Sequence, residues 1–402
     1  MSDVTTPALG FQLGTPASGP VTPRIDCDLD DFRAIVETTV DLADYPHASA
    51  IERGAVAYEA ARVRDAIRDP ESAVAVRNEL TRALRDGPGI VVLAGSIAPD
   101  VVDRVTAAFE RLIAQQKAAG LAAGDHYAKP GANDRVWNAF EKLAVADPEA
   151  FVDYYSNDMI RLGALSWLGP AYQISSQVNL VHPGGEAQMP HRDYHVGFMT
   201  DDLAEQYPLH AHTMSPYLTL QGAAAHCDMP VESGPTMYLP HSHKYPHGFL
   251  AWRRPEFIEY FREHHVQVPL KKGDIVFFSP AMFHGAGTNR TTDIERMANL
   301  LQISSAMARA METMDHERIA NAVYPVLLRR QDEGMDPVLL ANAVAAAAEC
   351  YAFPTNLDRD PPLGGLTPPS QADIVTEALA ARTPPAALAD QLAAHQHRTR
   401  SH

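Results

Sequence analysis

The feature that most constrains the fold is a series of short apolar runs in the middle of the chain. Turns rich in Gly, Pro and Asp separate these runs, and only one clear helical pattern, at residues 255–264, interrupts them. The runs with strand character cover residues 172–181, 217–225, 266–270, 275–278 and 297–304. Many short strands with frequent turns are typical of a barrel or a double-sheet jelly roll. We therefore expect a β core in this part of the chain.

Helical patterns lie on both sides of the expected β core. Upstream, Ile51, Ala55, Tyr58 and Arg62 fall on one face of a predicted helix. Gly87-Pro88-Gly89 then ends the helical pattern and precedes a buried strand at 90–93. Further helices are expected at 99–119, at 148–167 and between 305 and 348, with a short last helix before a polar tail.

The sequence therefore predicts an α+β protein with four parts. The central part, 87–305, is expected to be a double-stranded β-helix, the jelly-roll arrangement of cupin-like proteins, with flanking helices. The other parts are a mobile N-terminal arm at 1–24, a helical N-terminal extension at 25–86, and a helical C-terminal extension with a polar tail at 306–402. The helical extensions offer surfaces through which a homo-oligomer can form.

Composition narrows the class of function. The 402 residues are 46% hydrophobic and 21% charged, which is typical of a globular protein. A net charge of −17 argues against binding to nucleic-acid phosphates, which requires clustered Lys and Arg. No apolar stretch is long enough to span a membrane, and the N-terminus has no pattern of a secretion signal. We expect a cytoplasmic protein that acts on a small molecule and binds neither nucleic acid nor membrane.

Histidines gather in the β region, where twelve of the eighteen fall between His182 and His284. In His191-Arg192-Asp193 the imidazole and the carboxylate are two residues apart, so that both point to one face of an extended chain. His284 follows the predicted strand at 275–278 and precedes the small residues Gly285-Ala286-Gly287. Two histidines and one carboxylate form the facial triad of non-haem iron(II) oxygenases. The sequence thus predicts a metal site at His191, Asp193 and His284.

An arginine in an apolar strand adds a second element. Arg296 opens the run 297–304, and a guanidinium in such a place needs an anionic partner, which it can bind through two parallel hydrogen bonds. Glu295 or Asp293 would be a structural partner, and a dicarboxylate co-substrate would be a functional one. Arg290 competes for the same role from a predicted turn. We favour Arg296, because a strand holds a side chain more precisely than a loop.

Together these residues resemble the phytanoyl-CoA dioxygenase family of iron(II)/2-oxoglutarate oxygenases, which includes ectoine hydroxylase-like members. Three further segments are similar to the family over residues 87–305, namely Gln177-Val178-Asn179, Glu232-Ser233-Gly234-Pro235-Thr236 with Leu239-Pro240-His241-Ser242-His243-Lys244, and His284-Gly285-Ala286-Gly287-Thr288-Asn289. Met189-Pro190 before His191, His241 in place of a glycine, and one extra residue between His284 and the arginine depart from the family pattern.

The resemblance implies Fe(2+), 2-oxoglutarate and O2 as cofactor and co-substrates. It also implies the hydroxylation of a small organic metabolite, with release of succinate and CO2. By resemblance, His191, Asp193 and His284 bind iron, and Arg296 holds the far carboxylate of 2-oxoglutarate. Asn179 and Gln177 are expected beside the co-substrate, although a strand amide can equally bond to the backbone.

Four further residues are candidates for the substrate pocket: Tyr194, His195, His226 and Tyr238. Each can equally be a buried core residue. His195 extends the metal motif to His191-x-Asp193-x-His195 and is an alternative third ligand. The same cluster also leaves open a zinc hydrolase, in which the metal activates water, and a non-catalytic binding protein that keeps the fold.

Overall fold

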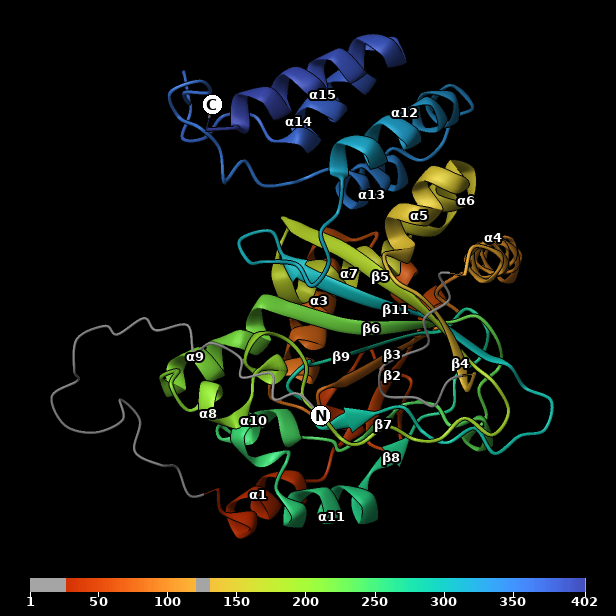
Figure 1. The fold of residues 1–402 in the computed structure, drawn as a ribbon, viewed down its shortest axis with the longest axis vertical. Helices are drawn as coiled ribbons and strands as arrows, with labels where there is room; N and C mark the ends of the chain where they lie inside the picture. Colours follow the sequence, from red (N-terminus) through yellow and green to blue (C-terminus); the bar gives the residue numbers. More distant parts are fainter. Residues whose placement is uncertain (1–26, 121–130, 402) are drawn as a thin grey trace, which may run out of the picture.

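The computed structural model describes residues 27–120 and 131–401, so the predicted arm at 1–24 lies outside the described residues. Two β-sheets lie at the centre of the protein, and helices surround them (Figure 1). The larger sheet has the strand order β1-β2-β3-β9-β6-β11-β5-β4, and the smaller has the order β10-β7-β8. The strands are β1 (Ala50–Glu52), β2 (Ala55–Glu59), β3 (Ile90–Ala94), β4 (Asn133–Val136), β5 (Tyr172–Val181), β6 (Thr219–Ala225), β7 (Met237–Tyr238), β8 (Val266–Gln267), β9 (Ile275–Phe278), β10 (His284–Gly285) and β11 (Arg296–Ser305).

From β5 onward the chain passes back and forth between the two sheets. It runs from β5 to an isolated bridge at His191, which pairs with His284 of β10, and then to β6 in the larger sheet. It continues through β7 and β8 in the smaller sheet, β9 in the larger, β10 in the smaller and β11 in the larger. Four segments therefore lie in each sheet, facing one another. This is a double-stranded β-helix, and the predicted jelly-roll fold is confirmed.

The larger sheet is buried on both faces, and its strands alternate between two cores. In β3, Val91 and Leu93 pack against the helices, whereas Ile90 and Val92 point into the jelly roll. The same alternation continues along β9, where Phe277 lies on the helical side and Phe278 on the inner side. A strand buried on both faces carries an unbroken apolar run. These segments could therefore be identified as strands from the sequence.

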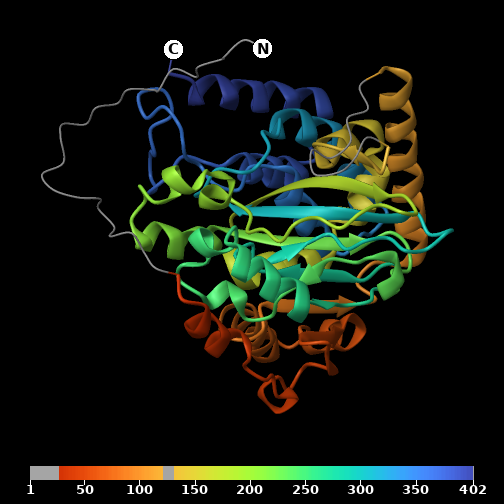
Figure 2. The same ribbon diagram turned by 60° about the horizontal axis from the view of Figure 1, so that its bottom comes forward.

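Helices cover the outer face of the larger sheet, and the C-terminal helices form a further layer above them (Figures 1 and 2). The helices of six or more residues are α1 (Leu29–Val36), α2 (Ala60–Ala66), α3 (Pro70–Arg85), α4 (Pro99–Ala118), α5 (Ala139–Ala146), α6 (Pro148–Tyr155), α7 (Asp158–Leu168), α9 (Leu209–Met214), α11 (Pro255–His264), α12 (His316–Asp332), α13 (Pro337–Ala347), α14 (Gln371–Ala381) and α15 (Pro385–Thr399). Two shorter helices are α8 (Asp201–Ala204) and α10 (Gly248–Ala251). An ion pair of 2.8 Å between Arg330 and Asp153 joins α12 to α6. None of the described helices combines the length and the apolar character needed to cross a membrane.

The helix predicted through residues 51–62 is wrong in its first part. Residues Ala50–Glu52 and Ala55–Glu59 form a hairpin whose second strand pairs in parallel with β3. Arg53 and Gly54 both have positive φ, which is the geometry of a tight two-residue hairpin turn. Alanine-rich apolar runs of this length fit a helix and a buried strand equally well. Here the residues form a strand because they pair with β3.

Other elements differ in extent from the prediction. The helical region expected between 305 and 348 begins at His316 and is divided into α12 and α13, and the strand expected at 217–225 begins at Thr219. The helix expected at 148–167 is broken into α6 and α7, because Asn157 accepts hydrogen bonds from two backbone amides and caps a new helix. The strand expected at 266–270 is only the short β8 (Val266–Gln267). The helix at 255–264 and the strands at 172–181 and 275–278 have the predicted bounds.

Candidate active site

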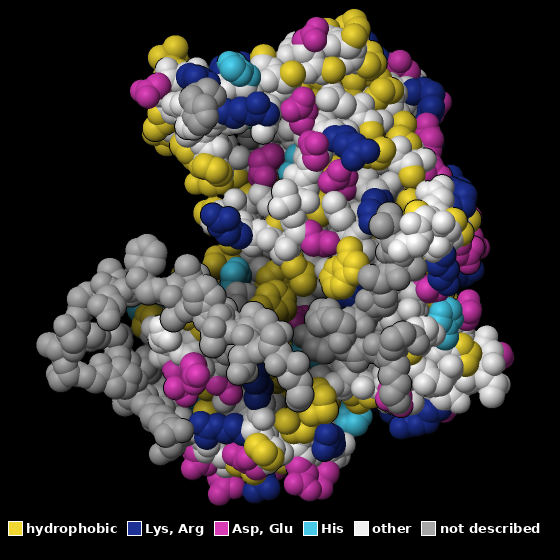
Figure 3. Space-filling model, viewed as in Figure 1, with side chains coloured by type: hydrophobic (Ala, Val, Ile, Leu, Met, Phe, Trp, Pro, Cys, Tyr) yellow, Lys and Arg dark blue, Asp and Glu magenta, His cyan; other side chains and the backbone are white. Residues whose placement is uncertain are grey.

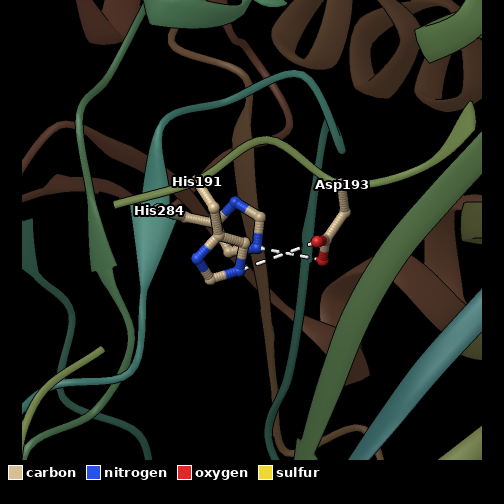
Figure 4. Close-up of side chains that lie close together, drawn as sticks. All are labelled: His191, Asp193 and His284. Carbon is tan, nitrogen blue, oxygen red and sulfur yellow. Dashed lines mark ion pairs between the residues drawn. The ribbon is translucent and has the colours of Figure 1, made fainter. Parts of the chain in front are cut away.

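His191, Asp193 and His284 meet at one end of the jelly roll (Figure 4). The Nε2 atom of His191 lies 3.7 Å from Oδ1 of Asp193, and Nε2 of His284 lies 3.5 Å from Oδ2. One ligand atom from each residue lies within 4.8 Å of the other two. Two imidazole nitrogens and one carboxylate oxygen suit a divalent transition metal, and three ligands leave further coordination positions for other molecules.

Backbone pairing places the two histidines side by side. The amides and carbonyls of His191 and His284 exchange two hydrogen bonds, of 2.9 and 3.1 Å, so both side chains lie on the same face of the smaller sheet. The Nδ1 atoms face the backbone carbonyls of Met189 and Met282, each at 2.9 Å. These contacts fix the ring orientations and direct both Nε2 atoms toward Asp193, as is usual for metal-ligating histidines.

Asp193 reaches the cluster from an extended segment that is not a continuous strand. In the segment 191–195, His191 alone forms a β-bridge, with His284. The chain turns directly after Asp193, where Tyr194 and His195 have positive φ. The alternative in which His195 is a third ligand is therefore not supported, and His195 is not part of the cluster. Burial alone would raise the pKa of Asp193, but the two histidines and a hydrogen bond from Gln221 together hold that pKa well below its usual range.

The three candidate metal ligands line a cavity of about 270 Å³ inside the jelly roll. Residues at alternate positions of three neighbouring strands line it, since alternate side chains of a strand share one face. They are Gln177 and Asn179 of β5, Gln221 and Ala223 of β6, and Arg296, Ala298, Leu300 and Gln302 of β11. The predicted co-substrate residues Gln177, Asn179 and Arg296 thus share one cavity with the three candidate ligands.

Arg296 is buried in this cavity without an ionic partner. Among the residues that the structure describes, no carboxylate forms an ion pair with it, and its Nη1 donates only a long hydrogen bond of 3.4 Å to the Gly287 carbonyl. Burial lowers the pKa of Arg296 to about 10. A desolvated guanidinium of this kind is costly unless an anion from outside the chain completes it.

Neither of the two carboxylates considered as a structural partner of Arg296 forms an ion pair with it. Glu295 is exposed and pairs with His182 at 3.1 Å, and Asp293 is exposed. Arg290 is exposed and does not line the cavity.

The two tyrosines proposed for the substrate pocket lie at and just behind the cavity wall. Tyr238 lines the cavity. Tyr194 lies behind the cavity wall, and its hydroxyl donates a hydrogen bond of 2.8 Å to Oε1 of the lining residue Gln302.

The prediction that His195 and His226 line the pocket is wrong. His195 faces the hydroxyl of Ser215 at 2.9 Å. His226 lies on the helical side of the larger sheet, between Thr106 and Tyr154, at 2.8 and 3.0 Å. The backbone amide of His226 bonds to Met297, so the residue continues β6 but its side chain faces away from the cavity.

Several cavity residues were not singled out in the sequence. Gln221 donates a hydrogen bond of 2.5 Å to Asp193, and Arg135 donates one of 2.6 Å to Gln177. The other such lining residues with polar, aromatic or thioether side chains include Trp137, Gln188, Phe198, Met229, Met311 and Gln302. The single amide in the strand β6, Gln221, was the available signal, since a buried amide needs partners.

Comparison with known proteins identifies the family of the chain. Residues 86–298 match the family described as Phytanoyl-CoA dioxygenase (PhyH). The multifunctional dioxygenase ausE of Emericella nidulans is 25% identical over 236 residues, which cover 56% of this chain and 72% of that protein. The multifunctional dioxygenase prhA of Penicillium brasilianum is 26% identical over 250 residues, covering 60% and 76%.

Solved structures also match. One is the non-heme alpha ketoglutarate dependent epimerase SnoN from nogalamycin biosynthesis, with 22% identity, a TM-score of 0.41, and coverage of 59% of this chain and 82% of SnoN. Another is AviO1 from Streptomyces viridochromogenes, with 21% identity, a TM-score of 0.41, and coverage of 57% and 95%. The family match spans more than half of the chain. The chain belongs to the phytanoyl-CoA dioxygenase family and is a non-haem iron enzyme that depends on 2-oxoglutarate.

Proposed function

We propose that the protein hydroxylates a small organic molecule in a reaction that consumes O2 and 2-oxoglutarate and releases succinate and CO2. One oxygen atom enters the product, the other enters succinate, and the 2-oxo acid supplies two electrons by losing CO2. The observation that carries the proposal is the shared cavity, in which a buried cation without an ionic partner among the described residues accompanies a cluster of two histidines and one carboxylate.

The residues divide the work as follows. His191, Asp193 and His284 would hold iron(II), which when bound supplies the centre where 2-oxoglutarate and O2 react. Arg296 binds the far carboxylate of 2-oxoglutarate through its planar guanidinium and gains the anionic partner that the described residues do not provide. Asn179 and Gln177, on the adjacent strand, offer amides to the same co-substrate. Gln221 holds Asp193 in the orientation that faces both histidines.

The remaining cavity wall belongs to the substrate. Trp137, Phe198 and Met311 line the cavity together with aliphatic residues of the sheets, and Tyr238 supplies a buried hydroxyl. This lining favours an organic substrate with a substantial apolar surface. On the surface of the molecule, Figure 3 shows a hollow on one side with hydrophobic side chains in it.

The direct test is the fate of labelled oxygen. Purified protein with iron(II), 2-oxoglutarate, ¹⁸O2 and a panel of small apolar metabolites should give succinate in proportion to a product that carries one ¹⁸O atom. Replacing iron with zinc should abolish both products. Turnover with zinc in the absence of 2-oxoglutarate would instead support the hydrolase alternative and contradict the proposal.

A further inference from the structure

A second cavity lies on the opposite side of the segment that carries the candidate metal ligands. His191 and Asp193 line the first cavity, and Arg192, between them, lines the second, because neighbouring side chains of an extended chain point to opposite sides. This second cavity has a volume of about 250 Å³. Since a water molecule occupies about 30 Å³ of liquid, the space suits an organic molecule of modest size.

The second cavity is cationic in a chain that is strongly acidic overall. Three cationic side chains line it, from Arg85, Arg192 and Lys244, against the single carboxylate of Asp86. Arg85 already engages that carboxylate with two hydrogen bonds, of 2.8 and 2.7 Å. Lys244 donates only to the backbone carbonyl of Asp86, at 3.1 Å. No carboxylate of the described residues forms an ion pair with Arg192 or Lys244, although the charge of Asp86 attracts Lys244 from a longer distance.

Arg192 is the most constrained of these cations. Its side chain is almost completely buried, and Gly248 packs so closely that a Cβ there would overlap the guanidinium. Its Nη2 donates to two backbone carbonyls, its Cζ lies about 5 Å from the Phe249 and Phe283 rings, and its Nε has no partner among the described residues. Carbonyls and rings stabilise a cation, but they do not neutralise it, so the cavity keeps a positive potential.

The rest of the lining suits the carbon skeleton of a ligand. Trp167 and Tyr217 are stacked at 5.4 Å and present aromatic surface. The Nε2 atoms of His212 and His243 donate to the backbone carbonyls of Ala204 and Arg85, so their Nδ1 atoms, which have no hydrogen-bond partner among the described residues, are acceptors that suit a hydroxyl group of a ligand. An oxyanion would find its donors in Arg192 and Lys244, and the aromatic pair would contact its organic part.

We propose that this second cavity is a binding site for a small organic oxyanion, bearing a phosphate or carboxylate group, that is separate from the catalytic cavity. The guanidinium of Arg192 and the ammonium of Lys244 would bind the acid group, and the planar fork of arginine suits either oxyanion. The proposal does not depend on the reaction that the enzyme performs, because the two cavities share no lining residue.

The test is calorimetric titration of the full chain with inorganic phosphate, adenosine 5′-monophosphate and succinate in a buffer without other oxyanions. At least one should bind saturably, and Lys244→Met should weaken that binding by about tenfold or more, as expected for one lost charge-assisted hydrogen bond. Arg192→Met should abolish it. Lys271→Met is the matched control, because Lys271 is an exposed lysine that pairs with Asp228 and does not line the second cavity.

The outcomes separate the two chemistries and the two cavities. Tighter binding of the phosphates assigns a phosphoryl ligand, and tighter binding of succinate assigns a carboxylate ligand. Succinate binding that Arg296→Met removes and Lys244→Met leaves intact belongs to the catalytic cavity and counts against the proposal. Absence of binding by all three probes at millimolar concentration, or an equal effect of Lys244→Met and Lys271→Met, overturns it. Lys244→Met decides the matter even where Arg192→Met fails to fold.

Discussion

Replacing Arg296 with methionine separates the two roles that a buried arginine can have. If Arg296 exists to bind 2-oxoglutarate, the methionine variant loses a pair of charge-assisted hydrogen bonds to a carboxylate in a desolvated cavity. Such a loss costs about 2–5 kcal/mol. Because each 1.4 kcal/mol is a tenfold change, we expect the apparent affinity for 2-oxoglutarate to fall about 30-fold to several thousand-fold.

The same substitution should leave the stability of the fold intact. Arg296 has no ionic partner among the described residues, and its one hydrogen bond, to Gly287, is long. An apolar side chain of similar length removes the cost of burying an unpaired cation, so the free energy of unfolding should stay within about 1 kcal/mol of the parent or rise. A structural ion pair would behave in the opposite way, since breaking one costs about 3–5 kcal/mol.

Two measurements on the same preparation decide between these roles. Binding of 2-oxoglutarate is followed by calorimetry with iron(II) under anaerobic conditions, and stability is followed by thermal melting without the co-substrate. Arg290→Met is the matched control, because Arg290 is exposed and lies outside the cavity, and it should change the affinity less than about twofold. Unchanged affinity in Arg296→Met, or a larger effect of Arg290→Met, would refute the assignment.

Three further predictions follow from single contacts. Gln221→Leu removes the hydrogen bond to Asp193, so iron affinity in a competition titration should fall about tenfold or more, while circular dichroism stays unchanged; an unaltered affinity would show that Gln221 does not position the ligand. Burial lowers the pKa of His226 to about 3, so the folded state excludes a proton that the unfolded chain binds below about pH 6.5. The stability that neutral His226 contributes is therefore complete above pH 6.5 and lost as the pH falls toward 3, and urea unfolding of His226→Phe should depend less on pH in this window; an unchanged slope would contradict this. As a metal ligand, Asp193 would occupy the coordination position that a halide needs, so added chloride should leave the products unchanged by mass spectrometry, and a halogenated product from the unmodified protein would remove Asp193 from the ligand set.

The strands β5, β9 and β11 of the jelly roll were predictable because each is largely buried on both faces. The apolar runs at β5, β9 and β11 could not be solvent-exposed loops, and their turns marked the ends. The strands β1 and β2 were missed because the alanines of Ala55–Glu59 suit a helix as well as they suit a strand, and only the pairing with β3 distinguishes them. The two-residue strands β7 and β10 have no periodicity to detect, since they exist only through pairing with each other.

The site shows the same division between local and long-range information. His191 and Asp193 were readable because their spacing is local, and His284 because it follows a recognisable strand. The turn after Asp193, which takes His195 away from the cluster, depends on positive φ angles at residues that do not favour them. The orientation of His226 toward the helices depends on contacts with Thr106 and Tyr154, which are far away in the sequence.

The most direct test of the account is the iron content of three histidine variants, measured by elemental analysis beside circular dichroism. His191→Ala and His284→Ala should remain folded and lose stoichiometric iron(II), because each removes one of the three ligand atoms that meet in the cluster. His195→Ala should keep the iron of the unmodified protein, since His195 faces Ser215 and lies outside the cluster. Full iron content in His191→Ala or His284→Ala, or loss of iron in His195→Ala, would contradict the assignment of the metal site.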